Sequence, residues 1–235
     1  MLTATEGELL AVLARGARLA PAARAALLAQ AAGGQDVDRL PLGERDRLII
    51  RLREAVLGRV VVAQDVCPHC GQTMEFSLDT GELSAPTASE PEPIRVDGYT
   101  VRLRVPTGED VASAAASERP HDALLERAVL EASRNGVVFA PADLPVAVQE
   151  ALNERIAAVD PLAEISLDLT CLDCAGQWAG LFDPLEFVWQ ELTEWGRELL
   201  HTVHILARAY GWTEPDVLAL PPLRRRAYVK LALDG

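Results

Sequence analysis

The spacing of apolar residues predicts that the first part of the chain is helical. Between residues 42 and 57, Leu48, Leu52 and Val56 recur at intervals of four, with arginine and glutamate between them. This is the pattern of an amphipathic helix, and Gly58 would end it. The stretch before it is rich in alanine and leucine and predicts two further helices.

The longest predicted helix lies in the last quarter of the chain. Asp183-Pro184-Leu185-Glu186 is a helix-start signal, because aspartate can cap the first turn and proline fits the first helical position. Apolar residues then follow one stripe to Tyr210, where Gly211 favours an end. A short helix capped by Thr213 and a basic helix over residues 223–233 are expected to follow.

Short runs that alternate apolar and polar residues predict three β-hairpins. In the second, Asp97-Gly98 is a strong turn signal, and Tyr99 and Val101 share one face. The stretch 80–93 is rich in glycine, serine, proline and glutamate and is expected to be a mobile linker or long loop. The paired runs are residues 60–62 with 74–78, 94–96 with 99–105, and 165–169 with 178–182.

All four cysteines lie in two Cys-x-x-Cys motifs, Cys67/Cys70 and Cys171/Cys174, each between strand-like runs. Two residues between thiolates let a tight turn present both sulfurs to one cation, and two such turns complete the tetrahedral shell that Zn²⁺ favours. We therefore predict one structural zinc ion, in a ribbon whose halves are separated by a long insertion. Four thiolates leave no open position for water or substrate, so the metal would hold structure.

Other uses of the cysteines are less well supported. Disulfides need an oxidising compartment, and the first six residues have neither the basic start nor the apolar core of a signal peptide. A redox Cys-x-x-Cys motif usually sits at a strand-to-helix junction, whereas strand-like residues follow both motifs here. His69 could replace a cysteine as ligand, but four sulfurs suffice and we expect it to be exposed.

Together these elements predict an α+β fold, mainly helical, with a split four-cysteine zinc ribbon built from two β-hairpins and a long C-terminal helix. Residues 1–58 would form an N-terminal helical region, residues 59–182 the ribbon with its insertion, and residues 183–235 a C-terminal helical region. Within the insertion, residues 122–133 and 145–159 each show a helical apolar pattern. The insertion is expected to pack on the ribbon or to face a partner.

The charge of the chain narrows its possible partners. The 235 residues carry a formal charge of -13, and the isoelectric point is near 4.8. This argues against nucleic acid as the main partner, because phosphate binding needs a basic surface, and it fits a basic protein partner. No run reaches the roughly eighteen apolar residues of a membrane span, so no membrane association is expected.

The sequence contains no catalytic motif. It has no nucleophile elbow, no phosphate-binding glycine loop and no His-Glu-x-x-His. His201 and His204 are three residues apart, but they fall on the polar face of the long helix, which favours a solvated or partner-facing pair over a second metal site. We expect neither enzymatic activity nor a small-molecule substrate.

Basic and aromatic residues near the C-terminus are candidates for partner binding. Arg224 and Arg225 belong to the densest basic cluster of this acidic chain, which is either a solvated helix end or a docking surface for an acidic partner. Tryptophan is enriched at binding hot spots. Trp189 and Trp212 are the better candidates, because Trp195 lies on the apolar stripe of the long helix.

Specific residues also follow one another in a characteristic order around both cysteine motifs and along the C-terminal part. They are Cys67, Pro68, His69, Cys70, Gly71, Phe76, Leu78, residues 103–108, Cys171, Cys174, Trp178, Asp183, Pro184, Phe187, Trp189, Glu191, His204, Ala207, Ala209, Tyr210, Gly211, Trp212, Glu214, Leu218, Leu220, Arg224, Arg225 and Tyr228. This order resembles the baseplate hub and assembly proteins of contractile phage tails of the T-even type and of phage-tail-like contractile injection systems.

The resemblance covers roughly residues 60–233. It implies a structural or assembly protein without catalytic activity, whose partners are other baseplate or tail proteins. Such a protein would be cytoplasmic during assembly and could be incorporated into the tail particle. Ala175 departs from the pattern, since glycine is expected after the second Cys-x-x-Cys motif, which puts the geometry of that turn in question.

Two other functions compete with that of a zinc-stabilised baseplate protein. A zinc-ribbon adaptor for nucleic acid or the transcription machinery would show salt-dependent affinity for DNA, which the acidic charge argues against. A metal-dependent enzyme built on the His201/His204 face would need a metal ion beyond the one held by the four cysteines.

Overall fold

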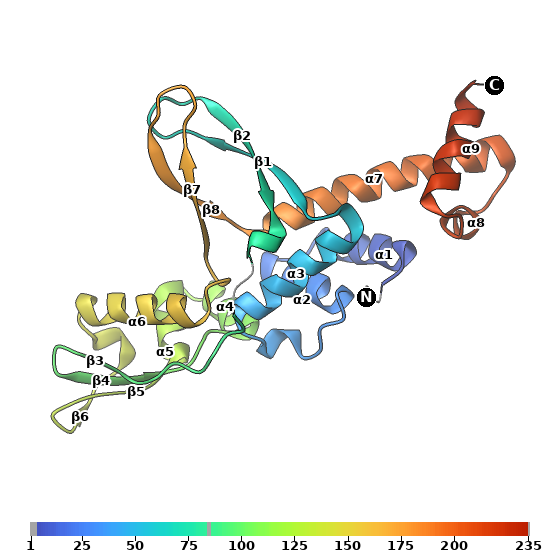
Figure 1. Ribbon diagram of the computed structural model, residues 1–235. Coiled ribbons are helices and arrows are strands. Elements are labelled where there is room, and N and C mark those ends of the chain that lie inside the picture. Colours follow the sequence, from blue (N-terminus) through green and yellow to red (C-terminus); the bar gives the residue numbers. More distant parts are fainter. Residues whose placement is uncertain (1–3, 84–85, 235) are drawn as a thin grey trace.

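The structure is a computed structural model that describes residues 4–83 and 86–234. A body of short helices carries a pair of β-hairpins and a separate small sheet with its own helices, and one long helix projects from the body towards the C-terminus (Figure 1). The predicted α+β fold, mainly helical, is confirmed. None of the described helices is both long and apolar enough to cross a bilayer.

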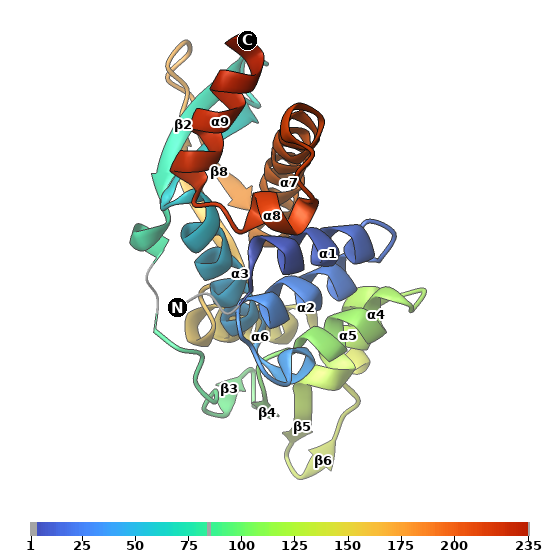
Figure 2. The same cartoon turned by 90° about the vertical axis from the view of Figure 1, so that its right-hand side faces the viewer.

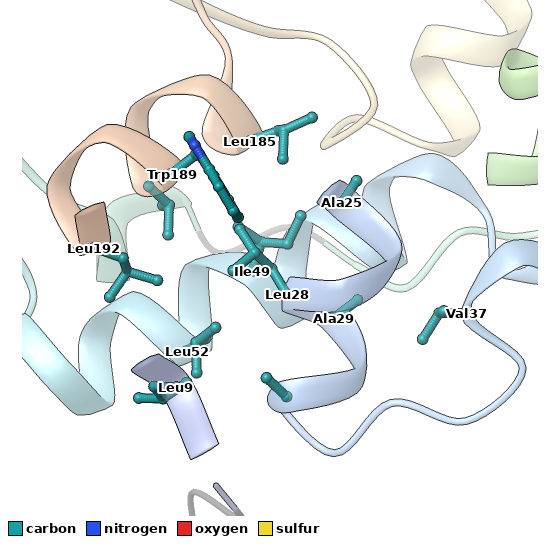
Figure 3. Close-up of a cluster of buried hydrophobic side chains, with 12 residues drawn as sticks. Leu9, Ala25, Leu28, Ala29, Val37, Ile49, Leu52, Leu185, Trp189 and Leu192 are labelled. Carbon is teal, nitrogen blue, oxygen red and sulfur yellow. The ribbon is translucent and has the colours of Figure 1, made fainter. Parts of the chain in front are cut away.

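The body consists of α1 (Glu6–Gly16), α2 (Pro21–Ala31) and α3 (Leu42–Leu57), packed on the first turns of α7 (Pro184–Tyr210). A 3-10 turn at Val37–Arg39 joins α2 to α3. The apolar stripes read from the sequence meet in one cluster (Figure 3). Its buried members are Leu9, Ala25, Leu28, Ala29, Ala31, Val37, Ile49, Leu52, Leu185, Val188, Trp189 and Leu192.

Both local and distant groups fix the helix ends. At α1 the Thr5 hydroxyl accepts from the Glu8 N–H while the Glu8 carboxylate accepts from the Thr5 N–H. Asp183 caps the first turn of α7, as the sequence predicts. The start of α3 has no local cap, and the Gly43 N–H instead donates to the Asp160 carboxylate at 3.0 Å, 117 residues further along the chain.

Two hairpins carry the cysteine motifs at their tips. The first pairs β1 (Val60–Val66) with β2 (Thr73–Asp79), and the second pairs β7 (Ile165–Thr170) with β8 (Gln177–Phe182). Each is a separate two-stranded antiparallel sheet. Their inner faces pack together, so the hairpins lie side by side although about 100 residues separate them (Figure 1). The buried residues of this cluster are Ile50, Val61, Leu162, Ile165 and Phe182.

The insertion between the hairpins contains an antiparallel sheet in the order β3-β4-β5-β6. The Asp97-Gly98 turn that the sequence predicts is present, with φ of 50° and 78° at its two residues. A second turn of the same kind at Asn135-Gly136, with φ of 50° and 77°, joins the last two strands. The strands are β3 (Ile94–Val96), β4 (Tyr99–Leu103), β5 (Val129–Arg134) and β6 (Val137–Val138).

The prediction of a helix over residues 122–133 is wrong in its second half. Helix α5 (Pro120–Ala128) stops where β5 begins. Val129 and Ala132 are buried, and Ala132 lies opposite Val101 in the ladder with β4. The apolar residues that continue a helical pattern are thus buried by a strand, because pairing with β4 outweighs local propensity.

The insertion has a hydrophobic core of its own. Helix α6 (Val146–Val159) packs on the sheet and confirms the helix predicted over residues 145–159. Helix α4 (Gly108–Ala115) is tied to the sheet by Arg104, whose guanidinium donates to both oxygens of Asp110 at 2.6 and 2.8 Å. The buried members of the core are Ile94, Tyr99, Val101, Leu103, Leu125, Val129, Ala132, Leu144, Val148 and Leu152.

The stretch after β2 is a long loop that follows a 3-10 turn at Thr80–Leu83. Residues 84 and 85 lie outside the described residues. Further on, the Ala88 N–H donates to the Glu44 carboxylate at 3.4 Å, and the Ser89 N–H donates to the carbonyl oxygen that ends α6 at 3.2 Å. The loop therefore joins β2 to β3 while contacting both the body and the insertion.

The C-terminal helices form an arm at the distal end of α7. α8 (Glu214–Leu218) lies beside α1, and α9 (Pro222–Asp234) packs across the distal part of α7 (Figure 2). Their contacts centre on a cluster whose buried members are Val203, Leu206 and Val217. Arg225 on α9 donates to both carboxylate oxygens of Glu6 at 2.6 and 2.7 Å, which ties the arm to the first helix of the chain.

Arg53 connects the body to the first cysteine hairpin. Its guanidinium donates to both oxygens of Glu191 on α7 at 2.8 Å and to the carbonyl oxygens of Gly58 and Val60. The Arg53 side chain is only 4% exposed, so these bonds hold a buried charge. They fix the start of β1, and hence the base of the hairpin, against α7.

Candidate metal centre

The four cysteine sulfurs converge between the tips of the two hairpins. All four Sγ atoms lie within 4.8 Å of one another. Across the hairpins, Cys67 Sγ is 3.7 Å from Cys174 Sγ, and Cys70 Sγ is 3.6 Å from Cys171 Sγ. The first cysteine of each motif is buried and the second is exposed, and all four are free thiols. Such a cluster can hold one metal ion.

The two tips repeat the same backbone turn. In the first, the Gly71 N–H donates to the Cys67 carbonyl oxygen at 2.9 Å; in the second, the Ala175 N–H donates to the Cys171 carbonyl oxygen at 3.0 Å. The donating residue is left-handed in both, with φ of 74° at Gly71 and 56° at Ala175. Ala175 therefore adopts the turn expected of glycine, at the steric cost that a Cβ imposes there.

A histidine contact also joins the tips. His69 is exposed, as expected, and its Nε2 lies 3.1 Å from the Gln177 carbonyl oxygen on β8. The His69 ring lies against Gly176, where a Cβ would collide with it. Gly176 is thus needed for the close approach of the first tip to the second.

Further contacts align the hairpins below the tips. The Trp178 indole N–H donates to the Asp65 carboxylate at 3.0 Å, which joins β8 to β1. Gly180 makes room for this pair, because a Cβ there would lie 3.1 Å from an Asp65 carboxylate oxygen. These partners are more than 100 residues apart, and no local pattern in the sequence could identify them.

The surroundings of the sulfurs affect their protonation. The backbone N–H groups of Cys174 and Asp173 point at the Cys171 sulfur and lower the pKa of Cys171 to about 7. At Cys70 the Gln72 N–H favours the thiolate, but desolvation and the three neighbouring sulfurs raise the pKa of Cys70 to about 12. Four thiolates this close repel one another, so a cation is needed to keep all of them ionised.

The structure places the two tryptophans predicted to bind a partner in different settings. Trp189 is buried in the main cluster, against Gly16 and with the Arg24 guanidinium 5.0 Å from its ring centroid. Its spacing four residues after Leu185 is the signal that would have placed it on the apolar stripe. Trp212 is half-buried beside two tyrosines of the arm.

The two arginines predicted to bind a partner also differ. Arg224 is exposed, whereas Arg225 is buried in its ion pair with Glu6. His201 and His204 are exposed on α7. Among the described residues, the four cysteines are the one group of three or more histidine, cysteine or acidic side chains that converges as a metal site would require.

Comparison with protein families gives a match, and it covers most of the chain. Residues 5–187 match the model of a family described as T4 bacteriophage base plate protein. The matched region includes both cysteine motifs and ends in the first turn of α7. No curated protein and no solved structure matches the chain. The chain belongs to the family of T4 bacteriophage base plate proteins, as its motif order led us to expect.

Proposed function

We propose that this chain is a structural or assembly protein of a contractile-tail baseplate, that one zinc ion stabilises it, and that it acts through contacts with other tail proteins without catalysis. The observation that carries the proposal is the family match over residues 5–187, which spans both cysteine motifs. The convergence of four sulfurs inside the matched region supports the metal ion in this proposal.

Zinc fits the sulfur cluster by geometry and by chemistry. With Zn–S bonds of about 2.3 Å, a tetrahedral site has sulfurs about 3.8 Å apart. The two distances across the hairpins, 3.7 Å and 3.6 Å, are close to this value. Thiolates select soft or borderline cations. Four of them fill the coordination shell, so the role we propose for the ion is to clamp the hairpins together.

The proposed division into regions follows from this role. The clamp would hold the ribbon with its insertion, residues 59–182, as one unit between the helical regions 1–58 and 183–235. Trp212 and Arg224 are accessible at the arm and remain our proposed partner contacts. For Trp189 and Arg225 to contact a partner, α1 would have to move, because it covers the Trp189 indole and pairs with Arg225.

Metal content is the first test. We expect about one zinc per chain in the purified protein, and its loss together with the fold of the hairpins in Cys67→Ser. Asp173→Asn is the matched control, since Asp173 is exposed in the second motif and has no sulfur. Absence of metal from the folded wild-type chain would remove the zinc clamp from the proposal.

Partner binding is the second test. The chain is co-expressed with the tail proteins encoded beside it, and we expect it to co-purify with at least one of them. Arg224→Glu should weaken the complex if the arm contacts the partner, whereas Arg155→Glu, an exposed control on α6, should not. Recovery of the chain alone under all conditions would count against a baseplate role. Salt-dependent DNA binding would instead favour the adaptor function.

A further inference from the structure

A cleft opens between the two cysteine hairpins and the start of α7. It has a volume of about 290 Å³. Residues of β1, β2, β7 and β8 form its walls, and the first turns of α7 close one end. The volume is at the lower limit of the roughly 300–1,000 Å³ that is typical of small-molecule sites. One long side chain inserted by a partner is therefore a better match than a large ligand.

Aromatic and aliphatic side chains form the apolar part of the cleft. Phe182 and Phe187 are paired, with ring centroids 5.4 Å apart, and Phe76 reaches the cleft from the first hairpin. Leu167 and Leu169 add aliphatic surface from β7. These groups suit an occupant with a hydrocarbon stem or a flat face that can stack on an aromatic ring.

The charged residues of the cleft are all acidic. Asp65, Asp183 and Glu186 line it, and its lining contains no basic side chain. Within the described residues, neutral donors satisfy these carboxylates. Asp65 accepts from the Trp178 indole, Asp183 accepts from N–H groups of α7, and Glu186 accepts from the Gln190 amide at 2.7 Å. None of the three forms an ion pair with a described residue, so no basic side chain of the described part of the chain neutralises their charge.

One carboxylate of the cleft, Asp183, also acts on a buried carboxylate of α3. Burial, with smaller contributions from Asp183 and Asp160, raises the pKa of Asp46 to about 6 even though Arg45 lies beside it. Asp46 itself is paired with Arg45 at 2.7 Å. A cation entering the cleft would therefore be attracted by the carboxylates of its lining, Asp65, Asp183 and Glu186.

We propose that the cleft receives one arginine side chain from a basic, apolar-flanked segment of another tail protein, and that it is an anchor point of the baseplate contact. Arginine fits because its planar guanidinium can bind carboxylates in a fork, stack on the phenylalanines and leave its stem on the leucines. This inference rests on the proposed function and specifies the chemistry of one partner. The hairpins that form the walls are the ones whose tips the sulfurs join.

The test uses a probe that presents only the proposed side chain. N-acetyl-arginine methylamide is titrated into isotope-labelled full-length protein, and amide chemical shifts are followed. We expect saturable shifts at Phe76, Leu181 and Phe187, which weaken as salt is added. N-acetyl-citrulline methylamide, a neutral isostere, should give no saturable response. Equal responses to the two compounds, or shifts outside the cleft only, would overturn the proposal.

Variants of Glu186 test whether arginine binds at the cleft or elsewhere on α7. Glu186→Gln should weaken arginine binding about two- to five-fold, the range for loss of one exposed charge contact. Glu186→Lys should abolish it. Glu194→Gln, two turns further along the exposed side of α7, is the matched control and should bind as the wild type does. Unchanged affinity in Glu186→Lys would contradict the assignment.

The co-expressed complex gives the test at the level of whole proteins. Glu186→Lys should reduce recovery of the tail protein while the metal content stays the same. If the complex forms undiminished, the baseplate role stands and the cleft is not its anchor. If raising the concentration of this protein alone shifts the cleft amides, and Arg226→Glu on the exposed side of α9 removes the shift, the occupant is a second copy, and the proposal of a separate partner is wrong.

Discussion

The two β regions of this molecule are held together in different ways. The four-stranded sheet of the insertion shares a cluster of ten buried residues with its helices. The cysteine hairpins share five, of which only Val61, Ile165 and Phe182 belong to their strands. On the outer side of β1, Val60 and Val62 are each more than half exposed. Because two-stranded hairpins are marginal in water, we expect the hairpin pair to depend on the proposed metal link between its tips and the insertion to be independent of it.

Removal of the proposed metal ion should have the largest effect and should affect the two β regions differently. Structural zinc sites in small domains contribute about 10–16 kcal/mol of binding free energy to folding. With a strong chelator, we expect amide-exchange protection to be lost in β1, β2, β7 and β8 and retained in β4 and β5. Hydrogen-exchange mass spectrometry measures both regions in one sample. Equal loss in both, or in neither, would contradict the comparison.

A core substitution in the insertion should destabilise the four-stranded sheet and leave the cysteine hairpins unaffected. Leu152 on α6 is fully buried, and Leu152→Ala should destabilise the chain by about 2–5 kcal/mol through lost contacts and the cavity that remains. Protection of β4 and β5 should fall, and zinc content should not change. Asn153→Ala, at the exposed next position, should alter stability by less than about 0.5 kcal/mol. Denaturant unfolding and metal analysis measure the two effects.

The junction between the body and the hairpins should respond to pH. Burial raises the pKa of Asp46 from 3.8 to about 6. The folded chain therefore retains this proton to a higher pH than the unfolded chain. The resulting stabilisation is complete below pH 3.8 and is lost as pH rises through about 6. The loss amounts to at most about 3 kcal/mol.

In Asp46→Asn this titration is absent. The unfolding free energy of the variant should rise relative to the wild type between pH 4 and pH 7, by up to the same amount. Urea unfolding at several pH values measures the difference, in which the titration of other groups cancels. A constant difference across this range would show that Asp46 titrates normally.

The smallest expected effect compares the two hairpin tips with each other. Ala175→Gly should stabilise the chain by about 1 kcal/mol, because glycine adopts a positive φ without steric cost. Gly71→Ala should destabilise it by a similar amount, since no atom within 4 Å would obstruct the new Cβ and only the backbone conformation opposes it. Thermal unfolding of the zinc-loaded variants measures both. If both substitutions changed the melting temperature in the same direction, the two tips would not have the same backbone requirement for a residue with positive φ.

Local sequence patterns identify most of the helices and all the candidate ligands. The Cys-x-x-Cys spacing and the strand-like flanks locate both tips, and the stripe from Leu185 to Tyr210 gives the longest helix. The Asn135-Gly136 turn was also visible in the sequence and would have indicated the last two strands. These features depend on residues close together in the chain, which is why a single sequence can predict them.

Contacts between distant segments could not be predicted in the same way. Arg53 pairs with Glu191 and Gly43 donates to Asp160, with sequence separations of 138 and 117 residues. Neither partner carries a pattern that points to the other. The apolar run over residues 122–133 is split into α5 and β5 for a similar reason. Its second half becomes a strand because it pairs with β4, which is distant in the sequence. The acidic cleft likewise brings together side chains of five elements.

The order of the sulfurs along the chain has a consequence for biosynthesis. Cys70 and Cys171 are 101 positions apart. At about 5–20 residues per second, a ribosome needs roughly 5–20 s to add that many residues. During this interval Cys67 and Cys70 have no partner cysteines, while the sheet of the insertion, which has its own core, can already form. We therefore expect the nascent polypeptide to reach its final architecture in two stages, with the hairpin tips joined only once Cys174 has left the exit tunnel.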